Sequence, residues 1–336
     1  METRPDIPLT MPAAEHPKRT LRWALIGILL FWAVVVALLM QRQAIADWWQ
    51  LRDYTPPAAV VALADDVAMT DHARKLFYVN DPQIEDASTF NQHCRTGEYT
   101  IVLGCYISGD RGIYVFAIDD ERLDGIKQVT AAHEMLHAAY ERLPTKERQR
   151  VDRLTAAVFA NLQNDRVTAS IERYRDNDPS VVPNELHSIL GTEVALLSPE
   201  LEEYYARYFT DRSRVVAYAE QYEAAFESRK TKIADYEAQL TDMQTEITAR
   251  SDVLKTRAET LERAYADLEA QRGTISAADF NQRAVAYNAE VAGYNSEVQA
   301  VGALITTYNE TYDAYTAVVL EQQDLFKAID SRPQEL

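Results

Sequence analysis

The most hydrophobic stretch of the chain runs from residue 23 to residue 40 and reads WALIGILLFWAVVVALLM. It contains no charged side chain, and a helix of about 20 apolar residues can cross the hydrocarbon core of a bilayer. Arg22 and Arg42 bracket the stretch, and Lys18 and Arg19 add positive charge on its N-terminal side. Because positive charge favours the cytoplasmic side, we expect a single-pass membrane anchor with the N-terminus in the cytoplasm.

A cleaved signal peptide is the alternative interpretation of this stretch. Ala44-Ile45-Ala46 resembles an A-x-A cleavage site just after the apolar run. The run is longer than the roughly 7 to 15 apolar residues of a signal peptide, which favours the uncleaved anchor. Both interpretations place the remaining chain outside the cytoplasm, and cleavage after Ala46 would make it a secreted protein.

Short elements follow the linker that contains Pro56-Pro57. Residues 58–80 have the pattern of one or two short amphipathic helices. Residues 100–107 and 112–118 are rich in β-branched and aromatic side chains, and the residues Ser-Gly-Asp-Arg between them favour a turn. The pattern therefore predicts an antiparallel β-hairpin.

The C-terminal third has a different period. Apolar residues recur there at steps of three, four and seven, which is typical of helices that pack along a seam. They are Ile233, Tyr236, Leu240, Met243, Ile247, Leu254, Leu261 and Leu268, then Phe280, Ala284, Tyr287, Val291, Tyr294, Val298, Val301, Ile305, Tyr308, Tyr312, Tyr315 and Val319. Because Arg272-Gly273 separates the two series, we expect an antiparallel coiled-coil hairpin. It could be a stalk, a self-association arm or a docking arm for a protein partner.

The segment 122–143 has a helical pattern and contains His133-Glu134-Met135-Leu136-His137, an H-E-x-x-H motif. On a helix the two imidazoles lie one turn apart on the same face, so both can bind one zinc ion. Glu134 is turned about 100° away, where it can act as general base toward a zinc-activated water. Alanines surround the motif, which favours a buried metal site over two surface histidines.

A catalytic zinc site of this kind has three protein ligands, so one more ligand is expected. The longer motif with a third histidine is absent, because Tyr140 and Leu143 occupy its Gly and His positions. Residues 183–193, PNELHSILGTE, form a second predicted helix that begins at a proline. It offers three candidate ligands, which are Glu185, His187 and Glu193.

A β-hairpin, an H-E-x-x-H helix and a second helix that begins N-E-x-x-S together resemble the gluzincin branch of the zincin metallopeptidases. The resemblance covers about residues 100–195 and implies that His133, His137 and Glu185 bind zinc while Glu134 is the general base. It also implies that residues 114–117 form the edge strand along which an extended substrate binds. Ile189 departs from the pattern, because the family has Asp there to orient a ligand histidine, a role that Glu193 could fill instead.

Gluzincins also supply a tyrosine or histidine that stabilises the transition state. The resemblance does not select one here, and the candidates are Tyr140, His187, Tyr204, Tyr205 and Tyr208.

Composition narrows the choice of partners. The chain has 336 residues with 34 Lys+Arg against 52 Asp+Glu, a net charge of −18. This charge argues against nucleic acid as a partner, because binding to phosphates needs excess positive charge. The two cysteines, Cys94 and Cys105, are too few for a disulfide-dense scaffold, and in an exported segment we expect them to pair, which stabilises the fold by about 2 to 3 kcal/mol.

These patterns predict an α+β protein with a zincin-like domain, mostly helical with a small antiparallel sheet. The expected parts are a cytoplasmic tail, a transmembrane signal anchor, a linker, a metallopeptidase domain and a coiled-coil hairpin, at residues 1–22, 23–42, 43–57, 58–212 and 213–330. The expected activity is zinc-dependent hydrolysis of peptide bonds in protein or peptide substrates outside the cytoplasm. The alternatives are a non-catalytic envelope scaffold that acts through its coiled coil, and a peptidase of peptidoglycan cross-links.

Overall fold

The computed structural model describes Glu2 and residues 18–94, 101–109 and 112–332. Most of the predicted N-terminal tail, the first residue of the predicted hairpin and half of its turn lie outside these ranges. The chain divides into two compact units, Met1–Pro56 and Pro57–Leu336.

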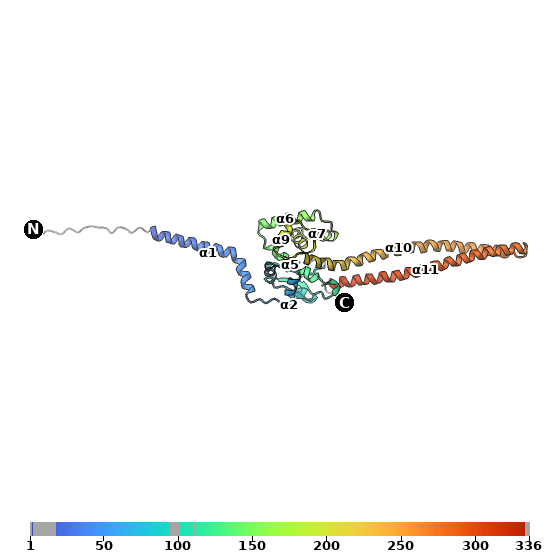
Figure 1. Ribbon diagram of the computed structural model, residues 1–336, viewed down its shortest axis with the longest axis horizontal. Coiled ribbons are helices and arrows are strands. Elements are labelled where there is room, and N and C mark those ends of the chain that lie inside the picture. The colour runs from blue at the N-terminus through green and yellow to red at the C-terminus, as the bar shows by residue number, and fades with distance from the viewer. Residues whose placement is uncertain (1, 3–17, 95–100, 110–111, 333–336) are drawn as a thin grey trace. The chain divides into compact units, whose positions relative to one another are not determined.

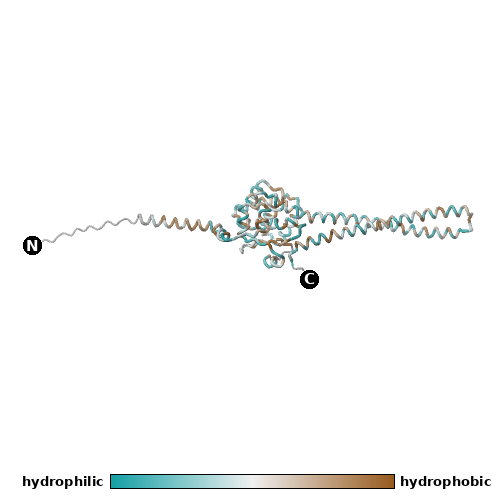
Figure 2. The backbone as a smooth tube through the Cα atoms, turned by 60° about the horizontal axis from the view of Figure 1, so that its bottom comes forward, coloured by the Kyte–Doolittle hydropathy of each residue, from teal (hydrophilic) through white to brown (hydrophobic). Residues whose placement is uncertain are grey.

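The first unit contains one long helix, α1 (Lys18–Leu51). Its segment Leu25–Leu51 is long and apolar enough to span a membrane or to serve as a signal sequence. The apolar run appears brown in Figure 2, and large side chains along it, such as Leu29 and Trp32, are exposed.

The second unit begins with short helices and a three-stranded sheet. Its first elements are α2 (Ala58–Asp66), α3 (Asp71–Tyr78), β1 (Gln83–Glu85), α4 (Ala87–His93), β2 (Gly104–Ile107) and β3 (Gly112–Phe116). Strands β2 and β3 pair antiparallel, with Cys105 opposite Tyr114, which confirms the predicted hairpin. Cys94 and Cys105 form a disulfide, the pairing that the sequence predicts, and it ties the end of α4 to β2.

The sheet corrects two expectations. Strand β1 pairs in parallel with β3, so the sheet is mixed and not antiparallel throughout as predicted. The strand order is β1-β3-β2, and β3 is the central strand. Residues 114–117 therefore cannot be the open edge for a substrate. The prediction failed because β1 has only three residues, too few to show a strand pattern in the sequence. Strand β2 is the edge strand on the side of the H-E-x-x-H helix.

Helices make up the rest of the unit. They are the short η1 (Glu121–Leu123), α5 (Ile126–Glu141), α6 (Thr145–Phe159), α7 (Asp165–Asn177), α8 (Val182–Glu193) and α9 (Pro199–Tyr205). Helix α5 is the central element, and it packs against α2, α3, α8 and the strands β2 and β3. Its small and apolar residues Ala131, Ala132, Met135, Leu136 and Ala138 are fully buried, which explains why the motif helix lies inside the molecule.

Two long helices, α10 (Ser213–Ala270) and α11 (Ala277–Ile329), form an antiparallel hairpin (Figure 1). Ion pairs Arg250–Glu297 and Arg257–Glu290 link them across the seam. Gly273 adopts a φ of +81° in the turn, a conformation that glycine reaches without strain.

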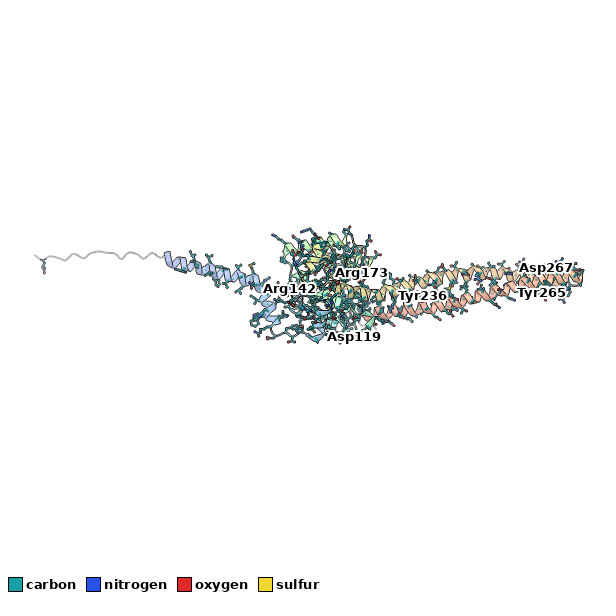
Figure 3. All side chains as sticks on the ribbon, in the orientation of Figure 1. Asp119, Arg142, Arg173, Tyr236, Tyr265 and Asp267 are labelled. Atoms are coloured by element: carbon teal, nitrogen blue, oxygen red, sulfur yellow. A yellow bond between two sulfur atoms is a disulfide. The ribbon has the colours of Figure 1, made fainter. Side chains whose placement is uncertain are left out.

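Figure 3 shows Tyr265 and Asp267 of α10 near this turn, at the far end of the helix from Tyr236. The predicted seam residues of α10 are all at least partly buried. The spacing of the apolar residues in the sequence therefore identifies the face of α10 that packs against α11.

The seam of α11 differs from the prediction. Tyr287, Tyr294, Val301, Tyr308 and Tyr315 face α10 as expected, and all are at least partly buried. The second predicted row is partly buried at Ala284 and Val291, near the turn, but farther along it Val298, Ile305 and Tyr312 are 42%, 41% and 51% exposed. From Glu297 onward the seam uses the row Glu297, Leu304, Thr311 and Val318 instead. Both rows lie next to the first one on a helix, so the apolar pattern alone selected the wrong neighbour.

The base of the hairpin is part of the core around α5. Helix α10 packs against α5 and α8. At the same base, Leu325 and Ile329 of α11 are buried with Phe90 and Phe116. Both helices of the hairpin are therefore packed into the unit at the base, while the turn lies far from it (Figure 1).

Candidate metal centre

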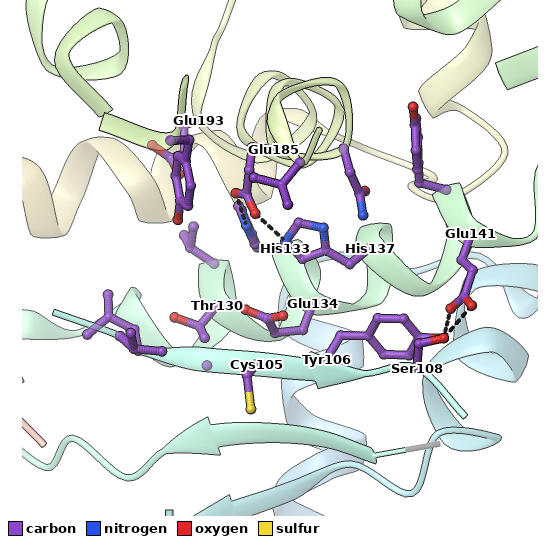
Figure 4. A pocket seen from close by; sticks show the side chains of 18 of the residues that line it. Cys105, Tyr106, Ser108, Thr130, His133, Glu134, His137, Glu141, Glu185 and Glu193 are labelled. Atoms are coloured by element: carbon purple, nitrogen blue, oxygen red, sulfur yellow. Dashed lines mark hydrogen bonds and ion pairs between the residues drawn. The ribbon is translucent and has the colours of Figure 1, made fainter. Parts of the chain in front are cut away.

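Helices α5 and α8 bring the three predicted ligands together. His133 Nε2 lies 3.6 Å from Glu185 Oε2, and His137 Nε2 lies 3.6 Å from Glu185 Oε1. The ligand atoms of the three residues all lie within 4.8 Å of one another (Figure 4). Helix α8 has Pro183 in its first turn, and the same turn holds Glu185, where the helix dipole favours a carboxylate.

These separations fit a metal ion. With zinc–ligand bonds of about 2.1 Å, two ligands of a tetrahedral site lie about 3.4 Å apart. Glu185 Oε2 is buried and has no hydrogen-bond partner, which is costly unless a cation binds there. Both observations favour a metal ion held by His133, His137 and Glu185.

The two histidines have different proton affinities. Burial disfavours a charged His133, but its close contact with the Glu185 carboxylate and the charges of Glu134 and Glu185 outweigh it and raise the pKa of His133 to about 9. Burial, and then repulsion from His133, lower the pKa of His137 to about 4. Burial alone would raise the pKa of Glu185, yet its contacts with the two histidines lower it. Without a metal, the site therefore holds one proton on His133 next to an ionised Glu185.

Ser188 of α8 also orients His137. The Nδ1 atom of His137 lies 3.3 Å from Ser188 Oγ. A donor bond from Nδ1–H to the Ser188 hydroxyl would leave Nε2 free to bind a metal. Ser188 thus takes the position that the resemblance assigned to an acid at residue 189, and Ile189 is buried in a small apolar cluster with Val167 and Ile171.

Glu134 lies between α5 and the edge strand β2. Figure 4 shows Glu134 and Thr130 directed from α5 toward this strand, on the side opposite Glu185. The strand approaches so closely that a Cβ atom on Gly104 would lie 2.4 Å from Thr130 Cγ2 and 3.0 Å from Glu134 Oε1. Glycine at this position therefore lets the edge strand pass directly over the carboxylate.

One cleft of about 650 Å³ joins these groups. His133, Glu134, His137 and Glu185 line it together with residues of β2. The hydroxyls of Tyr106 and Ser108 donate hydrogen bonds to Glu141, which fastens the end of β2 to the end of α5 (Figure 4). The cleft thus places the candidate metal site, a buried carboxylate and a strand edge side by side.

The other two candidate ligands, Glu193 and His187, contact other side chains instead of the three-residue cluster. Glu193 lines the cleft, but its carboxylate forms an ion pair of 2.5 Å with Arg166 of α7. Arg166 also pairs with Glu223 of α10, so it connects three helices. His187 is fully buried, and its Nε2 lies 2.8 Å from the hydroxyl of Tyr204. Burial lowers the pKa of His187 to about 3, so it is a neutral core residue.

The tyrosines of the site are mostly not those that the sequence suggested. Tyr204, Tyr205 and Tyr208 are buried in the core. Tyr140 lines the cleft, but its hydroxyl bonds to Asp152 at 2.7 Å. Tyr174 of α7 lines the cleft and forms a hydrogen bond to Glu185.

Sequence reasoning missed Tyr174 because it singled out no residue of α6 or α7 as a candidate for the site. Its position as the one aromatic residue in the strongly polar helix α7 was the available signal. Tyr222 of α10 also lines the cleft, and the sequence analysis did not identify it as a candidate.

Comparison of the chain with protein-family models, curated proteins and solved structures finds no match. The geometry of the cleft is therefore the evidence on which a function can be proposed.

Proposed function

We propose that the protein is a zinc metallopeptidase of gluzincin type with a zincin-like fold. The observation that supports this most is the meeting of His133, His137 and Glu185 at metal-ligand spacing, with Glu134 lining the same cleft. Zinc bound by these three residues would supply an activated water and would polarise the carbonyl of a peptide bond. Carboxylate and imidazole donors together suit zinc.

The chain's own residues would perform the remaining steps. Glu134 is buried beside the strand edge, where it would take a proton from the attacking water and pass it to the leaving amine. Ser188 would hold the ring of His137 in place. Tyr174 lines the cleft and bonds to a ligand, so it is the phenol best placed to donate a hydrogen bond to the developing oxyanion.

Strand β2 would bind the substrate. It is an edge strand of the sheet, and its residues line the cleft. An extended peptide can add to such an edge by backbone hydrogen bonds, which gives affinity without demanding a particular sequence. The scissile bond would then lie between β2 and α5, next to Glu134.

The location of the enzyme is part of the proposal. Helix α1 would anchor it to the membrane with the N-terminus in the cytoplasm, since the basic residues lie before the apolar run. The catalytic cleft and the α10–α11 hairpin, a coiled coil in this proposal, would then lie outside the cytoplasm. A disulfide between Cys94 and Cys105 suits an oxidising compartment of this kind.

The test is cleavage of casein and of a peptide library by the zinc-loaded full chain. Glu134→Gln removes the base and keeps the side-chain volume, so it should retain zinc and lower kcat/KM by about 10² to 10⁴-fold. Glu193→Gln is the matched control, because it makes the same change at a cleft residue that pairs with Arg166. A wild-type chain that binds zinc but cleaves no more than Glu134→Gln would contradict the proposal and favour a scaffold role.

A further inference from the structure

A row of apolar side chains follows α11, and its middle part lies outside the seam of the hairpin. Its members recur every seven residues and form what we call the outer row. They are Ala284, Val291, Val298, Ile305, Tyr312, Val319 and Phe326. The other members are partly buried or, like Phe326, pack against α10, but Val298, Ile305 and Tyr312 are 41% to 51% exposed.

Two packed helices do not require this row. A two-stranded seam needs two apolar rows, and charged residues usually flank it. An apolar row that continues outside a two-helix seam has the pattern of a bundle, in which a helix contacts more than one other helix. Between Val298 and Tyr312, α10 covers the row of Tyr294, Val301 and Tyr308 and leaves the outer row exposed.

The surface beside the outer row is almost free of charge. The two rows next to it hold Asn288, Asn295, Gly302, Asn309, Thr316 and Gln323, then Val285, Ala292, Gln299, Thr306, Asp313 and Leu320. Asp313 is their single charged member. By contrast, 20 of the 58 residues of α10 are charged. The outer face of α11 is thus a neutral surface on a chain of net charge −18.

We propose that this face binds the same face of a second copy of the chain, so that two hairpins form a four-helix bundle. Two molecules of charge −18 repel each other, and the neutral face is a surface on which they can approach without opposing like charges. A two-fold interface pairs identical patches, so a face without charge is complementary to itself. This inference does not depend on the proposed peptidase activity.

The face is large enough for a specific dimer. Val285 and Leu320 in the neighbouring row are 70% and 54% exposed, and they mark the two ends of the exposed apolar face. This face is about 52 Å long at about 1.5 Å per residue. A contact strip about 10 Å wide would bury about 500 Å² per chain, or about 1,000 Å² in total, which is the area at which a specific interface becomes possible. Ile305 is the midpoint of the row, so a two-fold axis through the centre brings it next to its own copy.

Cysteine cross-linking of the full chain in membranes tests this contact. The two native cysteines are already paired, so Ile305→Cys would supply a single free thiol. Under mild oxidation this variant should form a disulfide-linked dimer of twice the chain mass. Glu310→Cys is the matched control, since Glu310 is exposed on the opposite side of α11 and should stay monomeric. Equal cross-linking of the two variants, or an adduct of Ile305→Cys with a different protein, would overturn the proposal.

Light scattering of the full chain in detergent provides a second measurement. Val298→Glu with Ile305→Glu should weaken the dimer at least 100-fold while the helix content by circular dichroism stays unchanged, because both positions are exposed. Val253→Glu, at an exposed valine of α10, should remain dimeric. A monomeric wild type, or the same mass for all three proteins, would overturn the inference.

Discussion

His133 and His137 lie one turn apart and have different charges in the metal-free protein. Glu134 and Glu185 overcome the effect of burial at His133 and raise its pKa, while His137 stays neutral because it is buried beside a cation. A zinc ligand must be a neutral imidazole, so the metal has to displace the proton of His133. Zinc affinity should therefore rise with pH up to about 9, the pKa of His133.

Calorimetry can count this proton. At pH 6, His133 is protonated and His137 is neutral, and a zinc-bound water with a pKa of about 7 is still mostly protonated. Zinc titrations in buffers of different ionisation enthalpy should therefore show release of about one proton per metal. A value near zero or near two would contradict the charges assigned to the two histidines.

At the scale of single residues, the sequence predicted part of the site. The H-E-x-x-H spacing places two histidines and a carboxylate on known sides of a helix, and this requires no tertiary information. Selecting Glu185 over Glu193 was not possible from the spacing alone, because both lie on nearly the same face of α8. Arg166 distinguishes them by pairing with Glu193, and Arg166 comes from α7, whose position the pattern does not reveal.

At the scale of secondary-structure elements, the contact that shapes the cleft most is the one between β2 and α5. At Gly104 the strand and the helix are so close that any side chain would collide with Thr130. The sequence predicted the hairpin, yet it could not show which strand borders the H-E-x-x-H helix. That depends on β1, a three-residue strand whose pairing with β3 moves the open edge to β2.

Substitution of Gly104 tests this contact. Gly104→Ala should press on Thr130 and displace Glu134, lowering kcat/KM about 10-fold or more and the free energy of unfolding by about 1 to 3 kcal/mol. Thr130→Ser removes the methyl group that the new Cβ would meet and retains the hydroxyl that bonds to the carbonyl of Ile126. The double variant should recover much of both losses, and absence of recovery in a double-mutant cycle would show that this contact is not the cause.

On the scale of the whole molecule, the base of the hairpin lines part of the cleft that contains the candidate metal site. Tyr222 of α10 lines the cleft, and Glu223 next to it pairs with Arg166. The periodic sequence predicted two long helices and the turn between them, because that pattern is local. The periodic pattern did not predict how the base of the hairpin packs, since contacts among α7, α8 and α10 join segments far apart in the chain.

The metal content of three full-length proteins tests the central claim most directly. After dialysis against a weak chelator, the wild type and Glu193→Ala should each retain about one zinc per chain by elemental analysis. Glu185→Ala should retain almost none, because two histidines alone leave the site without its third ligand. Equal retention by Glu185→Ala and the wild type, or a wild type without zinc affinity, would contradict the assignment of His133, His137 and Glu185 as a zinc site.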